Sequence, residues 1–539
     1  MKLNISLSYT GLLVSNLIAI PSVFAVKNEV PKKPNVLLII TDDQRWDAIS
    51  ASGVHKWLQT PNMDKLAQNG VMFTQAFCQA PLSAASRSAI FSGRYAHRTG
   101  VYGFENVPDT SSYVRPWISD IMGVNGYERA LFGKDGSVLR NQNATNGKWE
   151  SQGLAHYPAG FNDLGYYKKQ DPEPKPKNWD ELGVLTRKGE KTGGVIIAGK
   201  HPNEQGKTID AYIADDALKF IGSRSGNADN PFFLTVGFNF PHTPVLVPEP
   251  FDKLYDPAKM VIPEFTDDEN SKISPQVQKA IKNFKFENLT NDEIKRTIAH
   301  YYAYNTYGDT YLGKVVDSFK AQSKAEGREW LIILVSDNGW HMGEHNMNAK
   351  FTFYDISTHL PLIVSSSDKR FPKNVRFDKM VEFVDIAPTI LGAAGIKVPE
   401  YMDGIDLFKS VKSKKPLRNE VISEEFHVMS RGMVRGYYKK KLYVFSMRTR
   451  PNGFVLNQQM DWVKTAPDSE LDMHLFDMAK DPRQVNNVAK DPAYKEIVAD
   501  FKQRFIKRLF TDRVEPVWRN TIKQRGEGYG SGKDNDQME

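Results

Sequence analysis

The chain has very little cysteine, since Cys78 is the only one among 539 residues. One cysteine cannot form an internal disulfide, so stability has to come from a hydrophobic core and from any bound metal. Low-complexity stretches and internal repeats are also lacking, which argues against fibrous and repeat architectures. Hydrophobic residues make up 40% and charged residues 25%. This globular composition and length allow one large domain and a smaller one.

A concentration of charge is missing as well. The net charge is +7, and the longest lysine run spans only residues 439–441. Dispersed charge argues against a nucleic-acid partner, and a mildly basic surface suits an anionic ligand.

Long hydrophobic runs are absent beyond the N-terminus, so no internal membrane span is expected. Lys2 precedes an apolar stretch at residues 5–20 that is interrupted by Ser, Thr and Asn, and small residues follow up to Ala25. The pattern predicts a signal peptide at residues 1–25, cleaved after Ala25; a membrane anchor is the alternative, which the polar interruptions disfavour. We therefore expect an exported protein, periplasmic or secreted, with no membrane association after cleavage.

Short apolar runs alternate with helix-like segments between residues 36 and 394. Buried parallel strands are expected at residues 36–40, 129–132, 232–238, 330–335 and 360–364, and helices at 62–68, 86–91, 209–221, 292–319 and 385–394. This alternation predicts a large doubly wound α/β domain at residues 26–400.

After residue 400 the pattern changes to closely spaced short strands, at 421–426, 433–438 and 441–445, and an amphipathic helix at 494–509. It predicts a smaller C-terminal α+β subdomain at residues 401–539, with a mobile, Gly-rich tail from Arg525. Segments 138–206 and 263–291 lack clear periodicity, and we expect them to be loops that shape a substrate cleft.

Polar side chains directly follow four of the predicted strands. Because the carboxyl ends of parallel strands meet at one edge of an open sheet, where ligands bind, we expect these side chains to lie together. Those from the first and fourth strands offer only oxygen ligands, which favours a hard cation such as Ca²⁺ or Mg²⁺; a helix N-cap is the alternative use of the first aspartates. In chain order the residues are Asp42 and Asp43, Lys134, His242, and Asp337 with Asn338.

The segment at residues 80–95, APLSAASRSAIFSGRY, resembles the signature of type I, formylglycine-dependent sulfatases. That signature is Cys or Ser, any residue, Pro or Ala, any residue, Arg, followed by a Gly-Arg-Tyr-type turn. By position Ser83 is the residue oxidised to formylglycine, and Arg87 is the arginine. Cys78 lacks an arginine at the right spacing, so we expect it to be a small buried hydrophobe. A serine-type signature implies a radical-based bacterial maturase as partner.

The resemblance extends from Pro34 to Asn487, and residues 348–361 are similar to the iduronate-2-sulfatase branch. It implies an alkaline-phosphatase-like fold, a sulfated poly- or oligosaccharide substrate, and Ca²⁺ in preference to Mg²⁺. The implied metal ligands are Asp42, Asp43, Ser83, Asp337 and Asn338. The implied catalytic residues are Ser83, Arg87, Lys134, His242 and Lys350, and Arg98 and His341 are candidate substrate contacts.

These implied roles fit the chemistry. A serine hydroxyl is a weak nucleophile at neutral pH, whereas a hydrated aldehyde beside a divalent cation has one hydroxyl to attack sulfur and a second to expel sulfate. Lys134 and Lys350 would neutralise the ester's charge, His242 would protonate the leaving alkoxide, and Arg87 would hold the formylglycine and the carboxylates.

One departure from the family pattern leaves alternatives open. The family usually has a histidine two positions after the first lysine, where this chain has Gly136. The alternatives are a phosphodiesterase or phosphonate hydrolase of the same superfamily, and a non-catalytic protein that binds sulfated glycan.

Overall fold

A computed structural model describes residues 32–101, 116–134, 181–187, 196–224, 229–425, 429–451 and 462–511. The predicted signal peptide, the tail from Arg525, Gly136 and most of segment 138–206 lie outside the described residues. The domain limits at residues 26–400 and 401–539 remain predictions. Among the described helices, none has the length and apolar character needed to cross a membrane.

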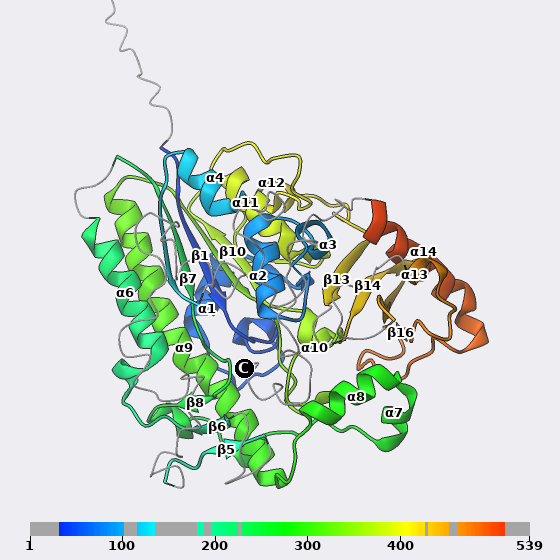
Figure 1. The fold of residues 1–539 in the computed structure, drawn as a ribbon. Helices are drawn as coiled ribbons and strands as arrows, with labels where there is room; N and C mark the ends of the chain where they lie inside the picture. Colours follow the sequence, from blue (N-terminus) through cyan, green and yellow to red (C-terminus); the bar gives the residue numbers. More distant parts are fainter. Residues whose placement is uncertain are drawn as a thin grey trace, which may run out of the picture. The chain divides into compact units, whose positions relative to one another are not determined.

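A seven-stranded sheet occupies the centre of the larger α/β part (Figure 1). Its strand β1 (Asn35–Thr41) is buried at every position and pairs in parallel with strands on both sides, which explains the unbroken apolar run in the sequence. The strands of this sheet are, in spatial order, β11 (Val375–Phe377), β2 (Gly70–Phe73), β10 (Leu362–Ser366), β9 (Trp330–Ser336), β1, β7 (Phe232–Gly237) and β4 (Glu128–Gly133).

Strand β10 runs antiparallel to both of its neighbours, so the prediction of a parallel strand at residues 360–364 is wrong in direction. The chain between β9 and β10 forms loops, a single 3-10 turn (Glu344–Asn346) and the short helix α10 (Asp355–Thr358). It therefore provides no long crossover helix to return the chain to the other end of the sheet. The sheet is therefore mixed, with β10 as its antiparallel member.

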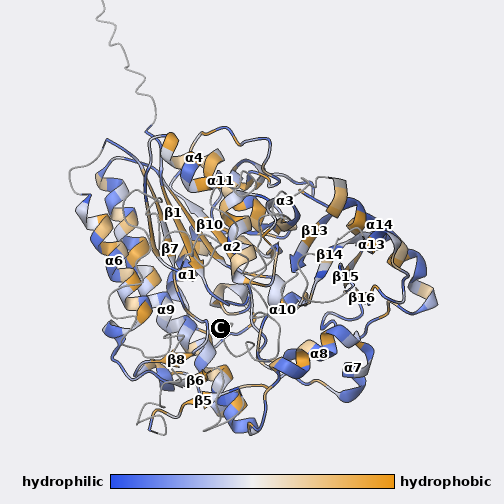
Figure 2. Ribbon diagram, in the orientation of Figure 1, coloured by the Kyte–Doolittle hydropathy of each residue, from blue (hydrophilic) through white to orange (hydrophobic). Residues whose placement is uncertain are grey.

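Helices cover both faces of the sheet, as a doubly wound fold requires. Side chains of β1 alternate between two hydrophobic cores: Leu37 and Ile39 face one, and Val36, Leu38 and Ile40 face the other. Both strands β1 and β7 are strongly hydrophobic (Figure 2). The first core is covered by α1 (Pro61–Gln68), α6 (Ile209–Ser223) and α9 (Asn291–Ala325), and the second by α2 (Ser83–Ser92), α4 (Ile118–Val124) and α11 (Ile386–Ala393).

The C-terminal part is an antiparallel meander covered by one helix (Figure 1). The helix α14 (Lys495–Thr511) packs Phe501, Phe505 and Leu509 onto the sheet. The three predicted strands are present, and a fourth that was not predicted, β16, completes the sheet. In order they are β13 (Glu420–Glu425), β14 (Arg431–Tyr438), β15 (Lys441–Arg448) and β16 (His474–Asp477), and α13 (Trp462–Thr465) precedes β16.

Segment 263–291 contains two helices, so the prediction of irregular loop there is wrong. Helix α7 (Asp267–Lys272) begins with a capping box of Thr266 and Glu269, and α8 (Pro275–Phe284) begins after the N-cap Ser274. Helix α7 has only six residues, whereas α8 buries Val277, Ala280 and Ile281 on one face, a helical spacing that is present in the sequence. The remaining short elements are α3 (Ala96–Thr99), α12 (Leu407–Ser410), the strand pair β3 (Ala76–Phe77) and β12 (Val381–Glu382), and a small sheet of β5 (Leu185–Thr186), β6 (Ile196–Lys200) and β8 (Leu246–Val247).

Candidate active site

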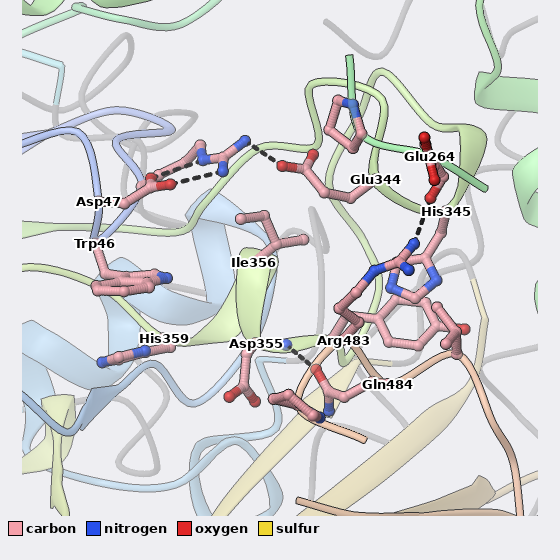
Figure 3. A pocket seen from close by; sticks show the side chains of 15 residues that line it. Trp46, Asp47, Glu264, Glu344, His345, Asp355, Ile356, His359, Arg483 and Gln484 are labelled. Atoms are coloured by element: carbon pink, nitrogen blue, oxygen red, sulfur yellow. Dashed lines mark hydrogen bonds and ion pairs between the residues drawn. The ribbon is translucent and has the colours of Figure 1, made fainter. Parts of the chain in front are cut away.

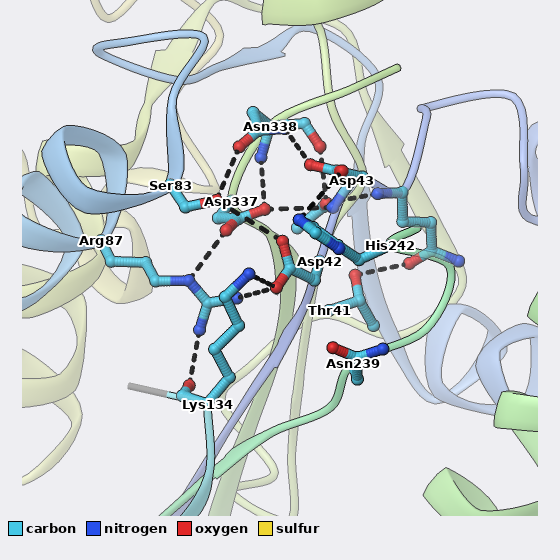
Figure 4. A network of polar contacts seen from close by, with 12 residues as sticks. Thr41, Asp42, Asp43, Ser83, Arg87, Lys134, Asn239, His242, Asp337 and Asn338 are labelled. Atoms are coloured by element: carbon cyan, nitrogen blue, oxygen red, sulfur yellow. Dashed lines mark hydrogen bonds and ion pairs between the residues drawn. The ribbon is translucent and has the colours of Figure 1, made fainter. Parts of the chain in front are cut away.

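Four buried oxygen-bearing side chains lie together at the carboxyl ends of β1 and β9 (Figure 4). The two strands pair in parallel with Thr41 opposite Ser336, so Asp42 and Asp43 lie beside Asp337 and Asn338. The backbone N–H of Asp43 donates to Asp337 Oδ1 at 3.1 Å, and Asn338 Nδ2 donates to Asp43 Oδ1. Asp43 has a φ of 63°, in the left-handed region that aspartate tolerates better than most residues.

Ser83 is the first residue of α2, and its hydroxyl faces this cluster. Its Oγ lies 3.2 Å from Asn338 Oδ1 and 3.5 Å from Asp42 Oδ1, and the residue is 3% exposed. Backbone N–H groups at the first turn of a helix favour an anion at this position. The serine therefore lies between potential metal ligands and an anion-binding helix end.

Three cationic side chains converge on the same cluster. Arg87, one turn after Ser83 on α2, donates from Nε to Asp337 Oδ2 at 2.8 Å and from Nη1 to the carbonyl of Lys134 at 2.7 Å. Lys134 Nζ pairs with Asp42 Oδ2. Lys350 Nζ lies 2.9 Å from Asp43 Oδ1 and 3.4 Å from Ser83 Oγ.

Burial and charge shift the pKa values of these groups in opposite directions. Burial raises the pKa of Asp43 to about 7, with Asp42 and Asp337 adding to it against Lys350. Burial acts in the same sense on Asp42, but Lys134, Arg87 and Lys350 lower its pKa overall. Burial lowers the pKa of Lys134, while the surrounding carboxylates outweigh burial and raise that of Lys350.

The donor set fits a hard divalent cation. Asp43 Oδ2 is buried and accepts no hydrogen bond, whereas Asp42 Oδ2 is paired with Lys134 and Arg87. Ligand atoms of Asp42, Asp43 and His242 lie within 4.8 Å of one another. The three carboxylates are balanced by one arginine and two lysines, so a divalent cation would make the site positive and suited to an anionic ester. Metal ions bound by such oxygen ligands polarise the substrate and increase the acidity of a bound hydroxyl group.

His242 borders the cluster on the strand β7 side. Its Nε2 lies 3.7 Å from Asp43 Oδ2, and its Nδ1 is hydrogen-bonded to the carbonyl of Thr243, which assigns the proton to Nδ1. Burial, together with Lys134 and Lys350, holds the pKa of His242 well below its usual value. The ring is therefore neutral, with Nε2 directed toward the cluster.

Asp210, on the first turn of α6, holds the loop that precedes His242. Its carboxylate accepts from the backbone N–H of Asn239 at 2.7 Å and of Phe240 at 3.3 Å, and from the Tyr304 hydroxyl at 2.8 Å. Burial raises the pKa of Asp210 to about 6. This role could not be predicted from the sequence, because a single aspartate at the start of a helix is a common cap.

The two candidate substrate contacts are engaged elsewhere in the structure. Both ring nitrogens of His341 have partners, Nδ1 with the Glu344 carbonyl at 2.9 Å and Nε2 with Thr352 Oγ1 at 2.7 Å, and the residue is fully buried. No ring nitrogen of His341 is left for a substrate. Arg98 forms an ion pair with Asp403.

Cys78 is buried, as expected. Burial raises the pKa of its thiol far above the usual value, so the thiol is unreactive.

A serine surrounded by buried carboxylates and cations, at the carboxyl edge of a mixed α/β sheet, defines an alkaline-phosphatase-like hydrolase of anionic esters. The family model described as Sulfatase matches residues 34–396, and the model described as N-sulphoglucosamine sulphohydrolase, C-terminal, matches residues 343–510. The chain therefore belongs to the sulfatase family and is a sulfuric ester hydrolase.

Named relatives support this assignment. A sulfatase of Formosa agariphila is 30% identical over 413 residues, which cover 73% of this chain and 75% of that protein. An ulvan-active sulfatase of the same organism is 24% identical, and the match covers 90% of this chain and 82% of that protein. The mouse (Mus musculus) iduronate 2-sulfatase is 26% identical, and the match covers 73% of this chain and 74% of that protein. Among solved structures, a phosphonate monoester hydrolase of Agrobacterium radiobacter has a TM-score of 0.68 at 22% identity, covering 89% of this chain and 96% of that chain.

Proposed function

We propose that this sulfatase hydrolyses a sulfate ester of a sulfated poly- or oligosaccharide, with Ca²⁺ bound at the carboxylate cluster and formylglycine formed at Ser83. The observation that supports this most strongly is the position of the Ser83 hydroxyl, at the start of α2 and within 3.5 Å of Asp42, Asn338 and Lys350. The ulvan-active relative indicates the carbohydrate class.

The side chains around Ser83 have different roles in the proposed mechanism. Lys134 and Lys350 would hold the sulfate oxygens, and a sulfate monoanion would take over contacts that they now make with Asp42 and Asp43. Arg87 fixes Asp42 and Asp337 in place from α2. Formylglycine would supply a hydrated aldehyde, whose paired hydroxyls serve for attack on sulfur and for release of sulfate. The overall reaction consumes one water and gives an alcohol and inorganic sulfate.

His242 would protonate the oxygen that leaves with the sugar. The ring is neutral without substrate, and a bound sulfate monoanion adds negative charge beside it, which raises the His242 pKa toward the protonated form. Asp43 Oδ2, which lies 3.7 Å from His242 Nε2, also raises the pKa of His242 when the carboxylate is ionised.

Replacing His242 by alanine should therefore affect substrates according to their leaving group. We expect kcat/KM to fall about 10²- to 10⁴-fold for a sugar sulfate, whose alkoxide needs a proton, and much less for 4-nitrophenyl sulfate. Steady-state kinetics on both substrates measure the difference between the two losses of kcat/KM. His300→Ala is the matched control, because that buried histidine contacts the Gly199 carbonyl instead of the cluster. Equal losses on the two substrates would contradict the proton-donor role.

Replacing Asp210 by alanine is expected to loosen the His242 loop. Each buried donor left without its acceptor costs about 1–3 kcal/mol, so the midpoint of thermal unfolding should drop and the activity on a sugar sulfate should fall with it. Asp210→Asn keeps an acceptor oxygen and should restore most of both. The control is Asp309→Ala, which also removes a buried acceptor of two backbone N–H groups, those of Asn62 and Met63. A drop in stability without any change in the sugar-to-aryl activity ratio would show that Asp210 does not position His242.

We also propose export through the signal peptide at residues 1–25 and maturation of Ser83 by a radical-based maturase. N-terminal sequencing of the protein secreted by a bacterial host tests the first point, with Val26 expected as the first residue. Retention of residues 1–25 would refute cleavage.

A further inference from the structure

A cavity of about 270 Å³ lies on the loops that follow β1 and β9 (Figure 3). Arg45, Trp46 and Asp47 come from the loop after β1, and Glu344 and His345 from the loop after β9. Gln484 closes it from the C-terminal part. Arg45 is two residues beyond Asp43, and Glu344 lies between Asn338 and Lys350, so the loops that form this cavity are those that bear the active-site carboxylates and lysine.

Two of the residues that line the cavity each carry a buried polar atom with no hydrogen-bond partner among the described residues. The atoms are His345 Nδ1 and Gln484 Nε2, in residues that are 5% and 2% exposed. The His345 ring is fixed by stacking on Tyr354, with centroids 3.6 Å apart, and Gln484 Oε1 accepts from the backbone N–H of Asp355 at 2.7 Å. Buried polar groups that remain unpaired lower stability, so these two point to a ligand with hydrogen-bonding groups.

The charges of the cavity disfavour an anionic ligand. Arg45 is fully engaged, with Nε and Nη2 each 2.8 Å from Asp47 and Nη1 2.7 Å from Glu344. Burial lowers the pKa of His345 well below its usual range, so its ring is neutral. The lining carboxylates are Asp47, Glu264, Glu344 and Asp355, against the guanidinium groups of Arg45 and Arg483, a formal charge of −2.

Trp46 provides a rigid aromatic wall. The side chain is partly buried and stacks on His359, with ring centroids 4.9 Å apart at 16°. Pyranose rings present C–H groups on their faces and hydroxyls around their edges, which suits an indole face combined with nearby hydrogen-bonding groups. A volume just below the roughly 300 Å³ typical of small-ligand pockets suits one sugar ring.

We propose that this cavity binds a neutral, unsulfated sugar unit of the carbohydrate chain whose sulfated unit lies at Ser83. The identification of the ligand as a carbohydrate rests on the proposed function. The enzyme would thus recognise its substrate over more than one sugar, with the sulfate held at the positive site and an uncharged unit held beside Trp46.

Direct binding tests the proposal without any turnover. Titration calorimetry would use unsulfated hexasaccharides (cellohexaose, mannohexaose, xylohexaose and neoagarohexaose), with hexagalacturonate as the anionic comparison. Because these probes undergo no chemistry at Ser83, a failure of the sulfatase mechanism leaves this readout intact. We expect at least one neutral hexasaccharide to bind, and Trp46→Ala to weaken that binding by about tenfold or more.

Two further variants keep the test decisive. Gln484→Glu retains the acceptor for Asp355 and removes the Nε2 donor, and it should weaken binding about fivefold. Trp462→Ala removes a tryptophan that does not line the cavity and should leave binding unchanged. Absence of binding by every neutral probe, unchanged binding in both cavity variants, or tighter binding of hexagalacturonate than of all neutral probes would each overturn the proposal.

Discussion

Replacing Ser83 by alanine is expected to lower kcat/KM for a sulfate ester by about 10⁴-fold or more while the protein still folds. In the proposed mechanism the Ser83 hydroxyl is the precursor of the aldehyde, and alanine has no group that could be oxidised to it. Ser83 is small and lies at the first position of α2, so loss of one oxygen should change the stability little. Hydrolysis of 4-nitrophenyl sulfate and the thermal unfolding midpoint measure the two effects.

Two variants serve as controls for this result. Ser88→Ala removes a buried hydroxyl on the same helix, one that donates to the Ala84 carbonyl at 2.6 Å, and should retain activity. Ser83→Cys should be active when produced with a cysteine-type maturase, because both residues yield the same aldehyde. Turnover by Ser83→Ala within tenfold of the unmodified chain would contradict the nucleophile assignment.

Removal of the metal is also expected to lower the activity by several orders of magnitude. Chelation with EDTA should lower the activity about 10³-fold or more, because a metal held by Asp42, Asp43, Asp337 and Asn338 would polarise the ester and the attacking hydroxyl. It should also lower the thermal unfolding midpoint, since a ligand bound by the folded state alone stabilises it. Ca²⁺ should restore both the activity and the unfolding midpoint more fully than Mg²⁺, a preference that follows from the likeness to sulfatases. Activity titrations with each ion measure the preference.

Asp42→Asn and Asp337→Asn should lower the activity as chelation does. Added Ca²⁺ should raise the activity and the unfolding midpoint of these variants less than those of the unmodified chain. Asp64→Asn is the control, because Asp64 contacts Ser50 and Ala51 away from the cluster. An unfolding midpoint that is the same with EDTA and with Ca²⁺ would argue against a bound metal. Full restoration by Mg²⁺ alone would refute the preference for Ca²⁺.

The grouping of the site residues could be predicted from the sequence because parallel strands share one carboxyl edge. Buried strands show as apolar runs, and the first polar residues after each run mark its end. The structure adds the pairing of Thr41 with Ser336, which places Asp42 and Asp43 beside Asp337 and Asn338. Ser83 and Arg87 were found from the signature rather than from a strand end, and the structure places both on α2 facing the same cluster.

Other features depend on contacts that a sequence does not record. The direction of β10 follows from the loop between it and β9, not from its own apolar residues. His341 follows the second metal segment closely, yet its ring turns inward to Glu344 and Thr352. Asp210, His345 and Gln484 have roles set by backbone groups or rings distant in the sequence, and nothing in their local patterns distinguishes them from ordinary caps and loop residues.

The most direct test of the account is the mass of the tryptic peptide that spans residues 66–87, from protein produced with the serine-type maturase. We expect a loss of two hydrogens located at Ser83, which corresponds to conversion of serine to formylglycine. A peptide with unmodified Ser83, from a host whose maturase is active on a known substrate, would contradict the proposed nucleophile and with it the mechanism.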